Sequence, residues 1–157
     1  MTKELPIHQR GFAAIGLFHP KDKDNMGGVI RAAGCYEAQM IAICGPRFGK
    51  SRTDTQKAWK HIPVIQTENL LSVIPFGAVP VAIEFIKDAR PLTSYTHPER
   101  AFYLFGPEDG SISKELLSAC RDVVYIPTRQ CMNLAATANV VLYDRMAKRS
   151  KLFGLED

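Results

Sequence analysis

Short apolar runs alternate with amphipathic stretches along the whole chain, and this alternation is its main structural signal. Continuous apolar runs of about four to eight residues are typical of strands that are buried on both faces of a sheet. Such runs predict strands at 11–18, 39–44, 62–66, 79–84, 101–105 and 122–126. Between them, the pattern predicts helices at 26–38, 54–60, 68–74, 113–120 and 133–148.

This alternation predicts an α/β fold, with a mostly parallel sheet and helices on both faces. The chain has 157 residues, of which 46% are hydrophobic, so we expect one domain over 1–157 with a substantial core. Ligands of such sheets bind beyond the carboxyl ends of the strands. Several turns at that edge combine Gly or Pro with Asn, Glu or Arg, so we expect the functional site there.

Composition adds limits to this picture. No apolar run reaches the roughly 18–20 residues that span a bilayer, and no charged and then apolar leader opens the sequence. The four cysteines form no CxxC pair and no zinc spacing with histidine, which indicates reduced thiols and no metal site. The formal net charge of +4 permits an anionic partner. We therefore expect a cytoplasmic protein without a membrane segment.

The first turn of interest contains Asn25, Gly27, Gly28 and Arg31. Asp24 or Asn25 can cap the helix that follows, and the glycines would let a ligand approach its first turn closely. We expect the stem of Arg31 to be half-buried. The alternative is a purely structural helix start in which Arg31 pairs with an acidic residue. Neither the dinucleotide fingerprint G-x-G-x-x-G nor the Walker pattern G-x-x-x-x-G-K-[ST] occurs.

The second turn, 105–110, places Glu108 at the tip of a strand that we expect to be central. This carboxylate could pair with Arg31 or accept a hydrogen bond from a ligand, although such a turn is also common as structure alone.

The third turn lies within the segment 126–139, IPTRQCMNLAATAN, where a strand passes directly into the last helix. Asn133 is a good helix cap, and backbone N–H groups at a helix start can point at a ligand. Cys131 could be a nucleophile, but no histidine has a recognisable relation to it, so we expect a buried neutral thiol. The last helix is apolar around its circumference, which predicts a second subunit packed on it or, alternatively, cover by the chain ends.

The three motifs together resemble the SpoU/TrmH branch of the SPOUT RNA methyltransferases. The family pattern is N-x-G-x-x-x-R after the first strand, then F-G-P-E, then I-P followed by S-x-N at the last helix. This chain has Asn25, Gly27 and Arg31, then 105–108, then Ile126, Pro127 and Asn133, with Cys131 at the serine position. Its loop 126–133 also looks about three residues shorter than is usual in the family.

The resemblance implies a deep trefoil knot at the C-terminus, S-adenosylmethionine as cofactor and a homodimer formed through the last helix. It implies methylation of a ribose 2′-hydroxyl in tRNA or rRNA, and the minimal size, similar to TrmL-type enzymes, favours tRNA. The implied catalytic residues are Arg31, Asn25, Glu108 and Asn133. The implied cofactor-binding residues are Ile83, Glu84, Leu104, Gly106, Ile126, Cys131 and Met132.

The sequence is compatible with two roles for Arg31 and for four basic loop residues. Arg31 could act as the base proposed in the family or, because arginine is effectively always charged, could grip a phosphate beside the developing alkoxide. Basic residues of two loops, namely Arg47, Lys50, Arg52 and Arg129, could bind RNA or could serve only solubility. The rival functions are a catalytically silent RNA-binding dimer of the same fold and a nucleotide-binding oxidoreductase.

Overall fold

The computed structural model describes residues 11–45 and 57–152. Its strands are β1 (Phe12–Phe18), β2 (Met40–Cys44), β3 (Val64–Thr67), β4 (Val79–Ile83), β5 (Arg90–Pro91), β6 (Arg100–Phe105) and β7 (Asp122–Tyr125). Its α-helices are α1 (Lys23–Cys35), α2 (Lys114–Ala119) and α3 (Leu134–Leu152). Short 3-10 turns form η1 (Ala58–Lys60), η2 (Leu70–Val73) and η3 (Leu92–Ser94).

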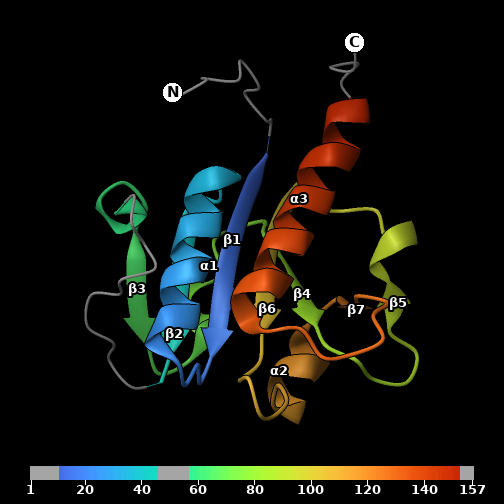
Figure 1. Cartoon of the computed structure of the whole chain (residues 1–157), viewed down its shortest axis with the longest axis horizontal. Helices are drawn as coiled ribbons and strands as arrows, with labels where there is room; N and C mark the ends of the chain where they lie inside the picture. The colour runs from blue at the N-terminus through green and yellow to red at the C-terminus, as the bar shows by residue number, and fades with distance from the viewer. Residues whose placement is uncertain (1–10, 46–56, 153–157) are drawn as a thin grey trace.

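The described strands form one parallel sheet in the order β3-β2-β1-β6-β4-β7-β5 (Figure 1). The predicted parallel sheet is therefore confirmed, and β6 is its central strand as expected. The edge position of β3 agrees with Pro63 beside it, because proline cannot donate to a strand ladder. The strand β5 was not predicted, because two residues are too few to produce a hydrophobic pattern.

Alternate residues of the strands pack into two separate cores. Ile15 and Tyr103 face α1 and α3 on one side of the sheet, where these two helices lie side by side (Figure 1). Phe102 and Leu104 face the other side, where they pack with Leu116 of α2 and with η2. The period of two along each strand thus covers both faces with helical segments, as the sequence predicted.

The helix ends differ from the prediction in ways that local chemistry explains. The N-cap of α1 is Asp22, whose carboxylate accepts hydrogen bonds from the N–H groups of Asp24 and Asn25 at 2.7 and 3.0 Å. The cap expected at Asp24 or Asn25 is therefore wrong by two or three residues. The predicted helix 68–74 is only η2, because few residues separate its cap, Asn69, from Pro75. Of the predicted helix 54–60, residues 54–56 lie outside the described residues.

A buried polar network fastens the second half of α3 to the amino ends of the strands. The guanidinium of Arg145, which is 4% exposed, donates to the carbonyl oxygens of Phe12, Pro98 and Glu99 and to the Tyr103 hydroxyl. His97 lies between Tyr103 and Asp144, with its ring nitrogens 2.6 and 2.7 Å from their oxygens. The helix α3 ends at Leu152, four residues beyond the predicted end at residue 148.

The protonation of this network follows from its burial. Burial lowers the pKa of His97 to about 4, although the Asp144 carboxylate opposes the shift. A neutral ring fits the contacts: Tyr103 donates its O–H to Nδ1, and the Nε2–H group donates to Asp144. The network is therefore a structural clamp at neutral pH. In the described part of the chain, no helix combines the length and apolarity of a membrane span.

Candidate functional site

Three neighbouring strands bring most of the predicted cofactor residues to one edge of the sheet. In the strand register, Ile83 of β4 lies beside Phe105 of β6 and beside Val124 of β7. The segments that follow these strands, containing Glu84, Gly106 and Ile126, therefore leave the sheet side by side at its carboxyl edge. Of the predicted residues, Leu104 is fully buried in the second core, so only its backbone could reach a ligand.

Glu84 joins the ends of β4 and β6. Its carboxylate accepts a hydrogen bond of 3.0 Å from the N–H group of Ile112. A side-chain carbon at Gly106 would lie 3.1 Å from that same nitrogen, so the backbone folds closely on itself within the turn after β6. Glu84 thus holds the turn after β6 against the end of β4, a positioning role that its sequence context did not reveal.

Glu108 joins the turn after β6 to the start of α1. Its carboxylate accepts hydrogen bonds from the backbone N–H groups of Lys21 and Asp22, at 3.0 and 3.3 Å, and from Nδ2 of Asn25 at 3.4 Å. The structure therefore brings Asn25 and Glu108 together. No hydrogen bond or ion pair joins Glu108 to Arg31 within the described residues, so the pairing considered from the sequence is not observed.

Lys21 and Asp109 add a second link between the same two loops. The Lys21 Nζ lies 2.7 Å from the Asp109 carboxylate, and this hydrogen bond is the main cause that lowers the pKa of Asp109. Both side chains are exposed, so the link contributes little stability by itself. No local pattern marks this pair, because 88 residues separate its members.

The first turns of α1 pack directly on the start of α3. A side-chain carbon at Gly28 would lie 2.7 Å from Cβ of Ala135, which is closer than two carbon atoms can approach. Packing of α1 on α3 therefore requires a glycine here. Arg31 follows Gly28 by three residues and hence lies about 60° around the helix from it. Arg31 is exposed as a whole residue, and burial of its stem stays a prediction.

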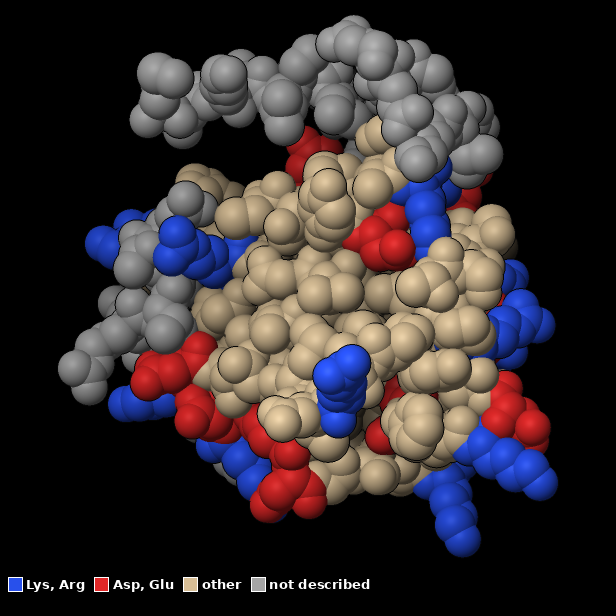
Figure 2. All heavy atoms as spheres, turned by 45° about the vertical axis from the view of Figure 1, so that its right-hand side comes forward, with Lys and Arg blue, Asp and Glu red and all other residues tan. Residues whose placement is uncertain are grey.

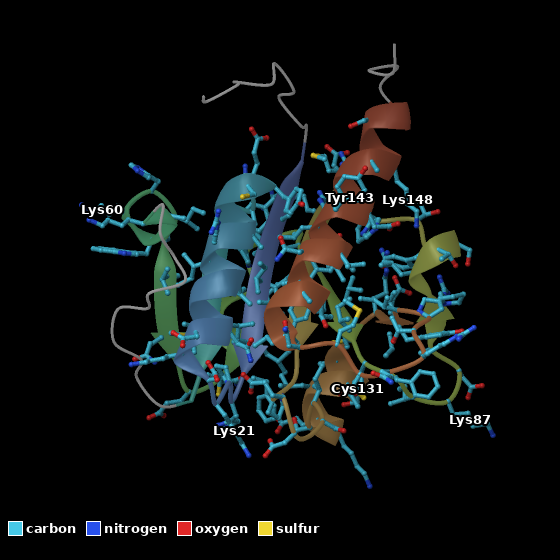
Figure 3. The ribbon with its side chains drawn as sticks, in the orientation of Figure 1. Lys21, Lys60, Lys87, Cys131, Tyr143 and Lys148 are labelled. Atoms are coloured by element: carbon cyan, nitrogen blue, oxygen red, sulfur yellow. The ribbon has the colours of Figure 1, made fainter. Side chains whose placement is uncertain are left out.

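The segment from Ile126 to Asn133 closes this edge of the sheet. Asn133 caps α3 as predicted, because its Oδ1 accepts a hydrogen bond of 2.8 Å from the N–H group of Ala136. Cys131 is exposed, so the expected buried thiol is wrong. Figure 3 places Cys131 at the same end of the molecule as Lys21. The loops before α1 and before α3 therefore border one region.

The backbone of residues 127–132 is available to a ligand. Within the described residues, no backbone–backbone hydrogen bond involves this segment, and the one polar contact of its backbone is from the Thr128 hydroxyl to the Gln130 carbonyl at 2.8 Å. Met132 is half-buried beside these polar groups. The loop thus offers backbone donors and acceptors next to an apolar side chain.

Cysteine chemistry has little support at this edge. The Cys44 sulfur lies 3.9 Å from Nε2 of His19, a contact between residues that the sequence gave no reason to pair. Burial raises the pKa of the Cys44 thiol, so it stays protonated and is a poor nucleophile. Across residues 11–45 and 57–152, no group of three His, Cys, Asp or Glu side chains could hold a metal ion.

The predicted RNA-binding residues are only partly described. Arg47, Lys50 and Arg52 lie outside the described residues. Arg129 is exposed on the loop between β7 and α3, close in sequence to Ile126 and Met132. Its contact with RNA stays a prediction.

Comparisons with known proteins find SpoU-type methyltransferases. The model of the SpoU rRNA Methylase family matches residues 13–143. The SpoU methyltransferase AviRb from Streptomyces viridochromogenes superimposes with a TM-score of 0.80 at 18% identity, covering 93% of this chain and 62% of that one. Its complex with the cofactor AdoMet gives a TM-score of 0.76 at 17% identity, covering 93% and 63%.

Two further structures are similar in fold. The TrmH/SpoU tRNA modifying enzyme of A. aeolicus gives a TM-score of 0.78 at 15% identity, covering 93% of this chain and 79% of that one. A protein studied for 2-OH methylation of C/U34 on tRNA gives a TM-score of 0.75 at 22% identity, covering 92% and 99%. Among the curated proteins, none matches. The chain spans about three fifths of the length of AviRb, and these identities support likeness of fold alone.

Proposed function

The chain belongs to the SpoU rRNA Methylase family, and from this premise we propose that it is an S-adenosylmethionine-dependent RNA methyltransferase acting on a ribose 2′-hydroxyl. The observation that carries the proposal is the family match over residues 13–143, which spans all three loops of the carboxyl edge. We favour tRNA as the substrate, because the chain covers 99% of the protein studied for methylation of C/U34 on tRNA.

The residues of the carboxyl edge fit the cofactor. Adenine and an amino-acid group need hydrogen-bond partners and an apolar surface, and the unpaired backbone of 127–132 beside Met132 and Ile126 offers both. Residues at the ends of β4 and β6, namely Ile83, Glu84, Leu104 and Gly106, would form the opposite wall through their backbone. When bound, the cofactor supplies an electrophilic methyl group that the ribose 2′ oxygen accepts as it loses its proton.

Arg31 is our choice for the group that acts on the RNA. Its guanidinium is exposed near the α1–α3 contact and has no hydrogen bond or ion pair within the described residues. A free guanidinium could grip the phosphate beside the target ribose and stabilise charge that develops on the 2′ oxygen. Such a role needs no deprotonated arginine, which its high pKa disfavours.

Asn25, Glu108 and Asn133 would act by positioning. Glu108 holds Asn25 and the residues before α1, so it fixes where α1 begins relative to the turn after β6. Asn133 fixes the first turn of α3, which packs on α1 at Gly28. Together they would set the distance between Arg31 and the cofactor loop.

We also propose a homodimer formed through α3. Leu134, Ala138 and Val141 are buried against the sheet, whereas Val140 and Tyr143 remain 38% and 55% exposed. Figure 2 shows a side of the molecule with a broad uncharged area, which is interrupted by a Lys or Arg side chain that projects below its centre and by a few acidic side chains. Exposed apolar side chains on an otherwise buried helix are what a second subunit would cover.

The trefoil knot of the family is a further part of the proposal. The segment after β4 leads to β5, and β7 enters the sheet between these two strands. The chain after β7 then returns to α3 on the face that carries α1. We propose that this return passes through the loop between β4 and β6, and a crystal structure tracing residues 84–99 and 126–133 would test it. We further propose a cytoplasmic location, as the reduced cysteines predict.

Radiolabelled cofactor and total RNA provide the direct test of the function. We expect label to enter RNA, and nuclease digestion followed by mapping would identify the methylated nucleotide. Loss of transfer in Arg31→Ala, with cofactor affinity measured by calorimetry unchanged, would support the assigned roles. Cofactor binding without transfer to any RNA would favour the silent RNA-binding dimer, for which Cys131 at the family's serine position is the motivating observation.

A further inference from the structure

A hollow lies at the β5 edge of the sheet, two strands away from β4. It has a volume of about 700 Å³ and is lined by residues at the end of η3 and just after it and at the starts of β5 and β7, including Arg90, Ser94, Tyr95, Thr96, Arg121 and Asp122. The floor of the hollow lies towards the amino ends of the strands, because Asp122 begins β7 beside Val81, two residues before Ile83. Arg90 begins β5 beside Val124 and therefore lies level with Ile83, near the carboxyl edge. Nothing in the proposed chemistry uses this hollow.

The floor of the hollow is a buried carboxylate with several donors directed at it. Oδ2 of Asp122 accepts hydrogen bonds from the Tyr95 hydroxyl at 3.0 Å and from Nε of Arg121 at 3.1 Å, and Nη2 of Arg121 also lies 3.1 Å away. Oδ1 lies 3.7 Å from Nη1 of Arg90, an ion pair without a hydrogen bond. The carboxylate is 8% exposed and lies beneath the two arginine side chains. Its contacts with both guanidinium groups hold them at the hollow.

The charges at the hollow do not cancel. Two arginines share one carboxylate, and His97 in the wall is neutral because burial lowers its pKa to about 4. The guanidinium side chains are 67% and 56% exposed for Arg90 and Arg121, so their remaining N–H groups are open to solvent. One uncompensated positive charge, held in place by a buried carboxylate, thus faces the hollow.

We propose that this hollow binds the phosphate group of a nucleotide. Guanidinium groups match phosphate oxygens in geometry and charge, and the Ser94 and Thr96 hydroxyls can add weaker donors. A volume of this size suits a nucleotide better than a lone ion. The phosphate could belong to an RNA strand, in which case the inference rests on the proposed function, or to a free nucleotide.

Adenosine 5′-monophosphate and inorganic phosphate are suitable probes, followed by NMR of the arginine Nε–H groups in the full chain. We expect the Arg90 and Arg121 signals to shift and saturate. The variant Arg90→Gln should weaken binding of the mononucleotide at least tenfold, and its fold should survive because Arg90 makes no hydrogen bond to Asp122. The control Lys114→Gln removes one exposed positive charge at the start of α2 and should change the affinity less than twofold.

A ten-nucleotide RNA, measured by fluorescence anisotropy at several salt concentrations, identifies the source of the phosphate. If RNA is the source, it should displace the mononucleotide, and Arg90→Gln should lower the slope of log Kd against log salt by about one. A mononucleotide that binds and is not displaced identifies a free nucleotide as the ligand. Equal losses in Arg90→Gln and Lys114→Gln, or shifts confined to the carboxyl edge, would overturn the inference.

Calorimetry with S-adenosylmethionine separates this inference from the proposed function. If S-adenosylmethionine does not bind, the proposed methyl transfer is refuted, whereas the mononucleotide titration still tests the phosphate site. If S-adenosylmethionine binds but the Arg90 and Arg121 signals do not shift with the mononucleotide, only the phosphate site is refuted.

Discussion

The contact between Gly28 of α1 and Ala135 of α3 offers a sharp test of how this site is assembled. The substitution Gly28→Ala adds one methyl group at the point where the two helices are closest. If the glycine serves helix packing, the substitution Ala135→Gly on the facing helix should restore the stability that Gly28→Ala removes. If Gly28 instead lets a ligand approach, Ala135→Gly should not restore what Gly28→Ala removes.

The magnitude follows from the geometry. The added carbon would lie 2.7 Å from Cβ of Ala135, whereas carbon atoms in contact prefer about 3.5–4.0 Å. The helices must therefore separate locally by about 1 Å, which at a packed contact costs about 1–3 kcal/mol. Replacing glycine by alanine inside a helix stabilises the helix by about 1 kcal/mol, because alanine has the higher helix propensity. We expect Gly28→Ala to lower the free energy of unfolding by about 1 kcal/mol.

The paired substitution gives a double-mutant cycle. Ala135→Gly alone should cost about 1 kcal/mol through helix propensity. In the double variant, the propensity changes offset each other and the clash is gone, so its stability should return close to that of the parent. The coupling free energy should therefore be about 2 kcal/mol.

Urea unfolding followed by circular dichroism measures these differences, and methyl transfer to RNA measures their effect on the site. Activity should fall in Gly28→Ala, because the start of α3 moves relative to Arg31, and should recover in the double variant. A coupling free energy near zero would refute the packing explanation. Recovered stability without recovered activity would show that Gly28 also serves a ligand.

Three other predictions test the site, the clamp and the interface. Arg31→Lys should lower the rate of methyl transfer at least tenfold with cofactor affinity unchanged, since lysine cannot donate two parallel hydrogen bonds; a parent-like rate would exclude a bidentate grip. His97 should make the protein less stable as pH falls from about 6.5 to about 4, because the unfolded chain takes up a proton that the folded ring resists. The loss should approach roughly 3 kcal/mol at the lower pH and be absent in His97→Gln, as urea unfolding across this range would show. Tyr143→Asp should convert a dimer to a monomer in analytical ultracentrifugation, because it places a charge in an uncharged interface; a dimer that persists would place the interface elsewhere.

Much of the fold could be predicted because its signals are local. The buried strands are short apolar runs, and the caps Ser113 and Asn133 directly precede the helices that they begin. The α/β class and the carboxyl edge as the position of the three motifs follow from these elements. The errors also have local causes. Asp22, Asp24 and Asn25 can all cap a helix, so the sequence does not single out Asp22 as the cap of α1. The strand β5 has only two residues, too few to show a hydrophobic period.

Contacts between distant residues could not be predicted in this way. Glu108 was expected to face Arg31 or a ligand, and the structure instead pairs it with Asn25 and the backbone of residues 21 and 22. The buried position of Arg145 within α3 was also missed, because its partners are carbonyl oxygens, which every residue possesses and no sequence pattern marks.

By itself, the sequence determined which segments form strands and helices, and it carried the motifs of a methyltransferase site. Periodicity and capping act within a few residues, so they can be read along the chain. The tertiary structure alone decided that β7 lies between β4 and β5, that Gly28 meets Ala135 and that Asp122 pairs with two arginines at the β5 edge of the sheet. These contacts depend on strand order and helix packing, in which many weak long-range interactions act together and no single residue reports the outcome.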